Sequence, residues 1–169
     1  MNKAVMIFSG GMDSATMLRM AQFSSGELHC LTFDYGQRHN REIECAKVQI
    51  EHAQVVSFSH KLVHKIIDVS FLKDLLPTSS LTNEKIDNPD VKDMVGEAQP
   101  VSYVPFRNQI FLSIACAYAE SIGANEVYHG ATQVDSLAGY WDGSEEFREQ
   151  FQTLISLNRK TDIALKCPL

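Results

Sequence analysis

The chain alternates short apolar runs with stretches whose apolar residues recur every three or four positions. The runs predict strands over residues 3–8, 28–33, 63–69, 126–129 and 162–167. The helical spacing predicts helices over residues 14–24, 40–53, 108–122 and 145–157. Alternating strands and helices indicate a parallel sheet with helices on its faces. The predicted fold class is therefore α/β, an open, Rossmann-like parallel sheet of about five strands with helices on both faces.

Two regions depart from this pattern. Residues 54–70 hold two strand-like runs, at 55–58 and 63–69, and we favour the second as the sheet strand. Residues 77–102 are polar and carry three prolines, without a clear period. A long stretch of this kind is typical of a mobile or substrate-covering loop.

The composition points to a globular domain. The chain has 169 residues, of which 44% are hydrophobic and 21% charged, and a net charge of −6. This charge argues against a broad basic surface for nucleic acid. No apolar run approaches membrane-spanning length, and the N-terminus leads into a core strand rather than a signal peptide. Cys30, Cys45, Cys116 and Cys167 are too widely spaced for a metal or disulfide framework, so we expect free thiols in the cytoplasm.

The most informative segment follows the first predicted strand and reads Ser9-Gly10-Gly11-Met12-Asp13-Ser14. A strand, a Gly-Gly turn and a helix start place backbone N–H groups and the positive helix end around one point, which suits a phosphate. A carboxylate there repels a phosphate unless a cation lies between them, so Asp13 predicts Mg²⁺. The alternative is an ordinary turn with Ser14 as the helix N-cap.

Two better-known phosphate loops are excluded. No Gly-Lys-Ser/Thr follows the glycines of this segment, and their spacing differs from the dinucleotide-binding fingerprint. The remaining pattern, S-G-G-x-D-S, resembles the PP-loop of the ATP pyrophosphatases, which split ATP between its α and β phosphates.

Three further segments carry unusual polar residues. Residues 34–39 offer an aromatic face and two cationic or donor side chains, Arg38 and His39, with a solvated turn as the alternative. Ahead of the helix at 108–122, Arg107 opposes the helix dipole unless an anion is near, whereas Asn108 also fits an ordinary N-cap.

The third segment, residues 130–144, combines two carboxylates, two aromatic rings and three glycines. Rings beside acidic acceptors suit a planar heterocycle with N–H donors, such as a guanine-like base, but a surface loop is an equal alternative. The segments at 9–14, 34–39 and 130–144 follow strand ends, where an open parallel sheet places its ligand site.

Together these motifs resemble the 7-cyano-7-deazaguanine synthase family of queuosine biosynthesis, over essentially the whole chain. The resemblance rests on residues 9–14, 32–39, 103–108 and 135–147. It implies an adenine nucleotide alpha hydrolase-like fold and a ligase that adenylates 7-carboxy-7-deazaguanine with ATP. Ammonia then displaces AMP to give an amide, and a second ATP drives dehydration to the nitrile.

The resemblance also implies roles for individual residues. Asp13, which would hold Mg²⁺, Arg38 and Arg107 would be catalytic. ATP would contact Phe8, Ser9, Gly10, Gly11, Met12, Asp13, Ser14 and Asn108. The deazaguanine would contact Tyr35, Gln37, His39, Asp135, Tyr140 and Asp142. A homodimer is a further expectation.

Two departures from the family pattern bear on these roles. The family usually reads Gly-Tyr-Pro-Asp-Cys-Arg where this chain has Gly139-Tyr140-Trp141-Asp142-Gly143-Ser144. The family also continues into a four-cysteine zinc segment, so we expect residues 1–169 to be a PP-loop nucleotide-binding domain truncated at its C-terminus, without zinc ligands. The alternatives are another PP-loop enzyme, for tRNA thiolation or amidation of another carboxylate, and a catalytically idle nucleotide-binding fragment.

Overall fold

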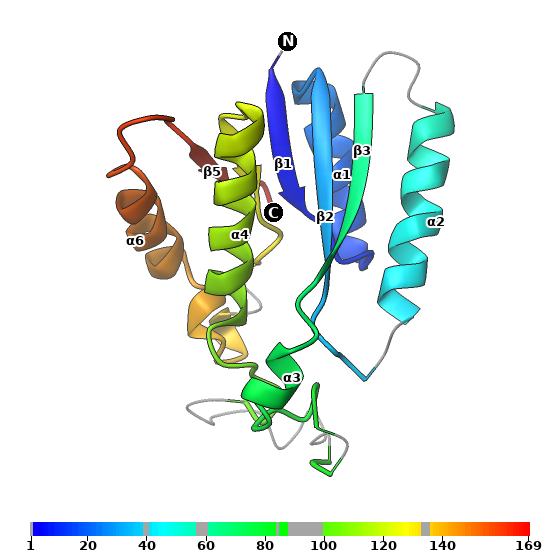
Figure 1. The fold of residues 1–169 in the computed structure, drawn as a ribbon, viewed down its shortest axis with the longest axis vertical. Helices are drawn as coiled ribbons and strands as arrows, with labels where there is room; N and C mark the ends of the chain where they lie inside the picture. Colours follow the sequence, from blue (N-terminus) through cyan, green and yellow to red (C-terminus); the bar gives the residue numbers. More distant parts are fainter. Residues whose placement is uncertain (1, 39–40, 57–60, 84, 88–99, 133–135) are drawn as a thin grey trace.

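Five parallel strands form the centre of the molecule (Figure 1). The computed structural model describes residues 2–38, 41–56, 61–83, 85–87, 100–132 and 136–169. The strands are β1 Lys3–Ile7, β2 Glu27–Asp34, β3 Lys61–Asp68, β4 Glu126–Tyr128 and β5 Ala164–Lys166. They pair in the order β3-β2-β1-β4-β5, and every pair is parallel. The predicted α/β class and strand number are confirmed.

Helices cover both faces of this sheet. They are α1 Met12–Ser24, α2 Arg41–Val56, the short α3 Leu72–Leu75, α4 Arg107–Ile122 and α6 Glu145–Ile155, with a 3₁₀ turn, η2, at Trp141–Gly143. One apolar cluster joins the sheet to α1 and α2, and a second joins it to α4 and α6. Two buried layers of this kind explain why β1 is apolar on both sides, with Val5 in one cluster and Met6 in the other.

The ambiguous region resolves as expected. The strand β3 covers most of the favoured run at 63–69, whereas Val55 and Val56 end α2. Helix α3 was not predicted, because four residues are too few to show a helical period. The starts of α1 and α4 lie two residues and one residue earlier than predicted.

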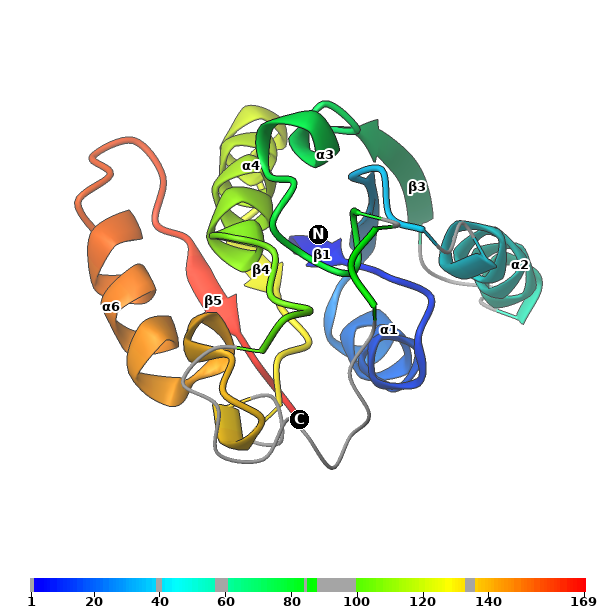
Figure 2. The ribbon, with the colours of Figure 1, turned by 90° about the horizontal axis from the view of Figure 1, so that it is seen from below.

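The order of the strands creates a switch point. The chain moves outward from β1 through β2 to β3, and then returns to place β4 on the other side of β1. Connections therefore leave β1 and β4 in opposite directions, which opens a crevice at their carboxyl ends. Figure 2 looks onto this end of the sheet, where the loops after β1, β2 and β4 gather. No helix in the described ranges has the length and apolar character to cross a membrane.

Candidate active site

A cavity of about 420 Å³ lies at this switch point. Such a volume is in the range of small-molecule sites. The loops after β1, β2 and β4 and the first turns of three helices contribute its walls. Its lining residues are Ile7, Phe8, Ser9, Gly11, Met12, Asp13, Ser14, Thr32, Phe33, Tyr35, Gln37, Arg38, Glu42, Ile43, Leu81, Arg107, Asn108, Phe111, His129, Gly130, Ala131 and Tyr140.

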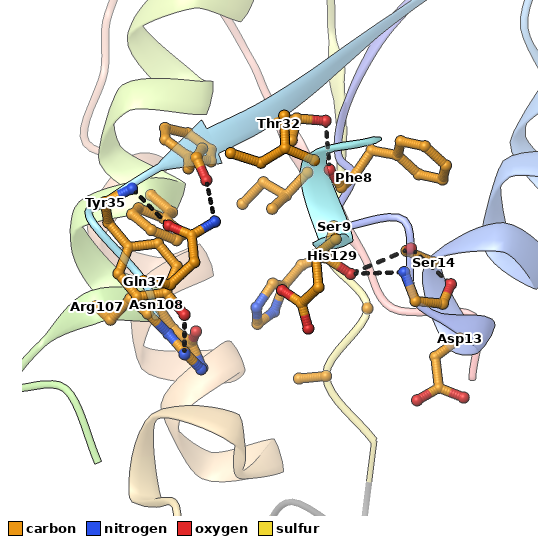
Figure 3. Close-up of a pocket in the computed structure, with 18 of the residues that line it drawn as sticks. Phe8, Ser9, Asp13, Ser14, Thr32, Tyr35, Gln37, Arg107, Asn108 and His129 are labelled. Atoms are coloured by element: carbon orange, nitrogen blue, oxygen red, sulfur yellow. Dashed lines mark hydrogen bonds between the residues drawn. The ribbon is translucent and has the colours of Figure 1, made fainter. Parts of the chain in front are cut away.

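The loop after β1 forms one wall, which we call the cradle (residues 9–14). Its hydroxyls hold the turn together, because Ser14 Oγ donates to the Gly11 carbonyl at 2.9 Å and accepts from the Gly10 N–H at 3.1 Å. Ser9 Oγ accepts from the Gly11 N–H at 3.2 Å. The side chains of Ser9, Asp13 and Ser14 lie on the same side of the cavity (Figure 3).

Gly10 gives the cradle its sharp turn. Its φ of +83° lies in the left-handed region, and a Cβ there would stand 2.7 Å from the Ala46 N and the Glu42 O of α2. Only glycine fits both the conformation and the close approach. Gly10 itself is therefore turned toward α2 and is not among the described residues that line the cavity.

Helix α1 begins without a side-chain cap. Its N-cap is Gly11, and no side chain accepts a hydrogen bond at that position. The alternative interpretation of Ser14 as N-cap is therefore wrong, since Ser14 lies within the first turn. An N-terminus that ends in a cavity without a capping side chain leaves first-turn N–H groups for an anionic ligand.

A buried hydrogen-bond chain fixes the end of β1 beside the cradle. Thr32 Oγ1 donates to the Phe8 carbonyl at 2.6 Å and lies 2.9 Å from His64 Nε2. Because the single hydroxyl proton goes to Phe8, His64 Nε2 must be the donor to Thr32. Burial lowers the pKa of His64, with a smaller contribution from Lys47, so this imidazole is neutral near pH 7.

The opposite wall carries Arg107 (Figure 3). Its guanidinium lies 5.6 Å from the centre of the Tyr35 ring and donates to the Tyr35 hydroxyl at 3.3 Å. Gln37 is buried and supports this wall, because its Oε1 accepts from the Tyr35 N–H at 2.9 Å. Tyr35 is likewise buried, so its ring supports Arg107 as well as facing the cavity.

Arg38 joins the cavity to the segment that follows α3. Its guanidinium donates to the carbonyls of Ser80 and Ile86 at 3.3 and 3.2 Å, and its N–H donates to Leu81 O at 3.0 Å. Leu81 lines the cavity, so the start of the predicted substrate-covering stretch does lie at the site. Residues 88–99 of that stretch are outside the described part.

The structure places Asp142 differently from the expectation that it faces the substrate. Its side chain is 2% exposed and is absent from the described lining of the cavity. Asp142 instead accepts from the Asn108 N–H at 3.3 Å, while Asn108 Nδ2 donates to its carbonyl at 3.2 Å. A carboxylate at a helix N-terminus satisfies an unpaired N–H and the dipole, which explains this position. Asn108 is consequently not the N-cap of α4, a place taken by Phe106.

The oxygen ligands that Mg²⁺ prefers are available on the cradle side. Asp13 and Glu42 both carry exposed carboxylates and line the cavity. Mg²⁺ is commonly held by one or two carboxylates together with substrate phosphates, so these residues fit the ion. Within the described ranges, no group of three His, Cys, Asp or Glu side chains is placed to hold a metal.

The cavity brings together most of the predicted site residues. Phe8, Ser9, Gly11, Met12, Asp13, Ser14, Tyr35, Gln37, Arg38, Arg107, Asn108 and Tyr140 all line it. His39 and Asp135 lie outside the described residues. Sequence reasoning missed Thr32, Glu42 and His129. Thr32 lies near the carboxyl end of β2 and His129 just after β4, so the strand-end rule applied to single residues would have indicated both.

Comparison with known proteins identifies the family. The family model described as queuosine biosynthesis protein QueC matches residues 3–169. The chain belongs to the QueC family. A relative, the 7-cyano-7-deazaguanine synthase of Oceanobacillus iheyensis, is 42% identical over 169 residues, which cover 99% of this chain and 72% of the relative.

Solved structures with low sequence identity share the fold of this QueC-family chain. The NH3-dependent NAD synthetase of Campylobacter jejuni matches with a TM-score of 0.52 and 17% identity, over 82% of this chain and 51% of that one. A predicted subunit of tRNA methyltransferase from Methanocaldococcus jannaschii matches with a TM-score of 0.55 and 13% identity, over 100% and 68%. This chain thus spans about half the length of the synthetase.

Proposed function

We propose that this QueC-family chain is the nucleotide-binding part of a 7-cyano-7-deazaguanine synthase, an ATP-dependent ligase. The observation that carries the proposal is the cavity itself. It sets an uncapped helix start with a Gly-Gly turn opposite a guanidinium and aromatic side chains. Such an arrangement suits ATP on one wall and an aromatic carboxylate on the other.

On this proposal, a carboxylate oxygen of 7-carboxy-7-deazaguanine attacks the α-phosphorus of ATP, and the bond to pyrophosphate breaks. The cradle N–H groups would bind the pyrophosphate as its charge develops. Arg107 would neutralise the attacking carboxylate and hold it in line, and Arg38 would add positive charge at the cavity edge. Ammonia then attacks the acyl carbon and AMP leaves, so an amide forms. A second ATP activates this amide for loss of water to the nitrile.

Mg²⁺ would be held by Asp13, with Glu42 in reach of the same cavity, and would neutralise phosphate charge when bound. Tyr140 would lie against the deazaguanine ring. Its planar ring suits stacking against a planar heterocycle. His39 and Asp135 stay predicted substrate contacts.

The rival activity of tRNA thiolation would call for a reactive cysteine near the cradle or a basic face that binds RNA. None of the described residues that line the cavity is a cysteine. Burial raises the pKa of Cys116 to about 11 and raises that of Cys30 further, so both thiols are inert.

The cysteines are free, which agrees with a place in the reducing cytoplasm. Assembly as a homodimer stays a prediction, as does the zinc that the family resemblance implies.

The test is an ATP–pyrophosphate exchange assay with each candidate carboxylate. We expect exchange that depends on 7-carboxy-7-deazaguanine and, with ammonium added, formation of the nitrile by mass spectrometry. Exchange with another carboxylate alone would identify a different ligase. ATP binding without exchange for any carboxylate would favour the idle nucleotide-binding domain.

A further inference from the structure

The backbone is strained where α4 meets the cavity. Phe106 has φ 55° and ψ 19°, and it is the one non-glycine residue with positive φ in the described ranges. A side chain in the left-handed region costs free energy, and such residues gather at functional sites because the surroundings hold them there. Phe106 is 53% exposed, so burial of the residue does not explain the conformation.

The hydroxyl of Tyr103 accounts for it. The Phe106 N–H donates to Tyr103 Oη at 2.9 Å, and Trp141 Nε1 donates to the same oxygen at 2.9 Å. Trp141 also packs edge-on against the Phe106 ring, with centroids 5.4 Å apart. One phenol oxygen therefore bonds both the strained backbone and the 3₁₀ turn η2.

These bonds belong to a longer contact between two segments that are far apart in sequence. Residues 102–108 and 140–142 meet in three pairs, namely Ser102 with Tyr140, Tyr103 with Trp141, and Asn108 with Asp142. The paired segments supply Arg107, Asn108 and Tyr140 to the cavity. The position of this wall thus depends on the contact.

We propose that Tyr103 is a positioning residue: its hydroxyl, with Trp141, holds Phe106 in the left-handed conformation and thereby aims Arg107 at the substrate carboxylate. Arg107 follows Phe106 directly, so the direction of its side chain depends on the Phe106 dihedrals. The role of Arg107 toward the carboxylate rests on the proposed function, whereas the dependence of Arg107 on Tyr103 does not.

The decisive experiment is a double-mutant cycle of Tyr103→Phe and Phe106→Gly. Glycine adopts positive φ without a steric cost, so it needs no hydroxyl to hold it. In the otherwise wild-type chain, Tyr103→Phe should raise the Kd of 7-carboxy-7-deazaguanine about tenfold, as expected for lost hydrogen bonds, and leave the Kd of ATP unchanged. In the Phe106→Gly background, the same change should have less than about a threefold effect. Equal effects in both backgrounds would overturn the proposal.

Tyr118→Phe is the matched control. The Tyr118 hydroxyl also makes a 2.9 Å hydrogen bond, to His29 Nδ1, but Tyr118 is not among the described residues that line the cavity. This variant should leave both dissociation constants at their wild-type values. A change as large as that of Tyr103→Phe would mean that any lost tyrosine hydroxyl disturbs the site, which contradicts the proposal.

A readout without substrate keeps the inference separate from the proposed function. The chain contains one tryptophan, Trp141, so its indole N–H gives a single resolved NMR signal. That signal and the Arg107 Nε–H signal should both shift in Tyr103→Phe and stay in place in Tyr118→Phe. If the wild-type chain binds no deazaguanine but Tyr103→Phe still shifts both signals, the proposed function is rejected and the positioning role is retained. An unmoved Arg107 signal would reject the positioning role.

Discussion

The side-chain amide of Gln49 donates a hydrogen bond of 2.7 Å to the carbonyl oxygen of Gly10. Gln49 lies in α2, outside every motif of the candidate site, and the bond ties the cradle to that helix. Because a trans peptide points its C=O and N–H in opposite directions, a Gly10 carbonyl held against α2 turns the Gly11 N–H away from α2. Gly11 lines the cavity and its N–H donates to Ser9 Oγ, so Gln49 helps to hold the turn of the cradle that would bind phosphate.

Loss of this bond should weaken ATP binding. Gln49→Ala removes a hydrogen bond of about 0.5–1.5 kcal/mol, so the KM for ATP should rise roughly two- to tenfold. Gln54→Ala is the matched control, because Gln54 lies in the same helix and donates to Leu62 O at 3.1 Å, away from the cradle. Steady-state kinetics compares the two variants. An equal KM for both would show that the Gly10 carbonyl needs no support from α2.

Gly10→Ala should be more destabilising than Gly123→Ala. Both glycines have positive φ, at +83° and +70°, but a Cβ at Gly123 meets nothing within 4 Å. Gly123→Ala should therefore cost only the left-handed conformation, about 1–2 kcal/mol. At Gly10 the contact with α2 backbone should add about 1–3 kcal/mol of overpacking. Urea unfolding measures the difference, and equal losses would contradict the close approach.

Asp13→Ala should abolish adenylation and leave the fold intact. Asp13 is exposed, so the loss of its favourable place in the first helical turn should cost less than about 1 kcal/mol of stability. Pyrophosphate exchange should fall at least about 100-fold if the carboxylate holds Mg²⁺. Asp74→Ala is the control, since Asp74 is an exposed first-turn carboxylate of α3. Near wild-type exchange in Asp13→Ala would rule out the metal role.

Tyr140→Ala should act on the deazaguanine and spare ATP. An aromatic ring stacked on a base contributes about 1–3 kcal/mol, so the KM for the deazaguanine should rise roughly 5- to 150-fold. Tyr140→Phe keeps the ring and removes only the hydroxyl bonded to Ser102 at 2.5 Å, so its effect should be smaller. Should both variants raise the KM of ATP and deazaguanine equally, Tyr140 would belong to the scaffold.

The extent of sequence-based prediction follows from how local each feature is. The strands and the cradle depend on neighbours within a few residues, and these were predicted, whereas the strand order that creates the switch point was not. The capping of α4 joins Asn108 to Asp142 across 34 positions, and the support of Gly10 by Gln49 spans 39. A periodic pattern carries no signal of such pairs, which arise only when helices pack.

The same reasoning explains the position of Asp142. A carboxylate in a glycine-rich loop is typical of a ligand contact when only the loop is considered. In the folded chain, the N–H of Asn108 at the start of α4 donates to that carboxylate, so Asp142 is held inside the protein. The sequence likewise predicts no separate role for Tyr103, because its bond to Trp141 exists only between packed segments.

The ion-pair cluster at the opposite end of the sheet predicts a pH dependence of stability. Glu27 Oε1 accepts from Lys61 Nζ and from His29 Nε2, each at 2.9 Å. These bonds, from Lys61 first and then His29, lower the pKa of Glu27 to about 2. In the unfolded chain this carboxyl titrates near its ordinary value of about 4.3. The unfolded state therefore binds more protons between these values, so the stabilisation is complete above about pH 5 and is lost toward pH 2.

Glu27→Gln should remove this part of the acid sensitivity. Below pH 5 the free energy of unfolding of the wild-type chain should fall more steeply than that of the variant, and the two should converge near pH 2. Urea unfolding at a series of pH values measures both slopes. The control is Glu44→Gln, whose 68% exposed carboxylate pairs with Lys47 on the surface of α2. Exposed ion pairs contribute little to the free energy of unfolding, so the pH curve of the control should run parallel to that of the wild type. If the Glu27→Gln curve also runs parallel to that of the wild type, the cluster does not stabilise the charged form of Glu27.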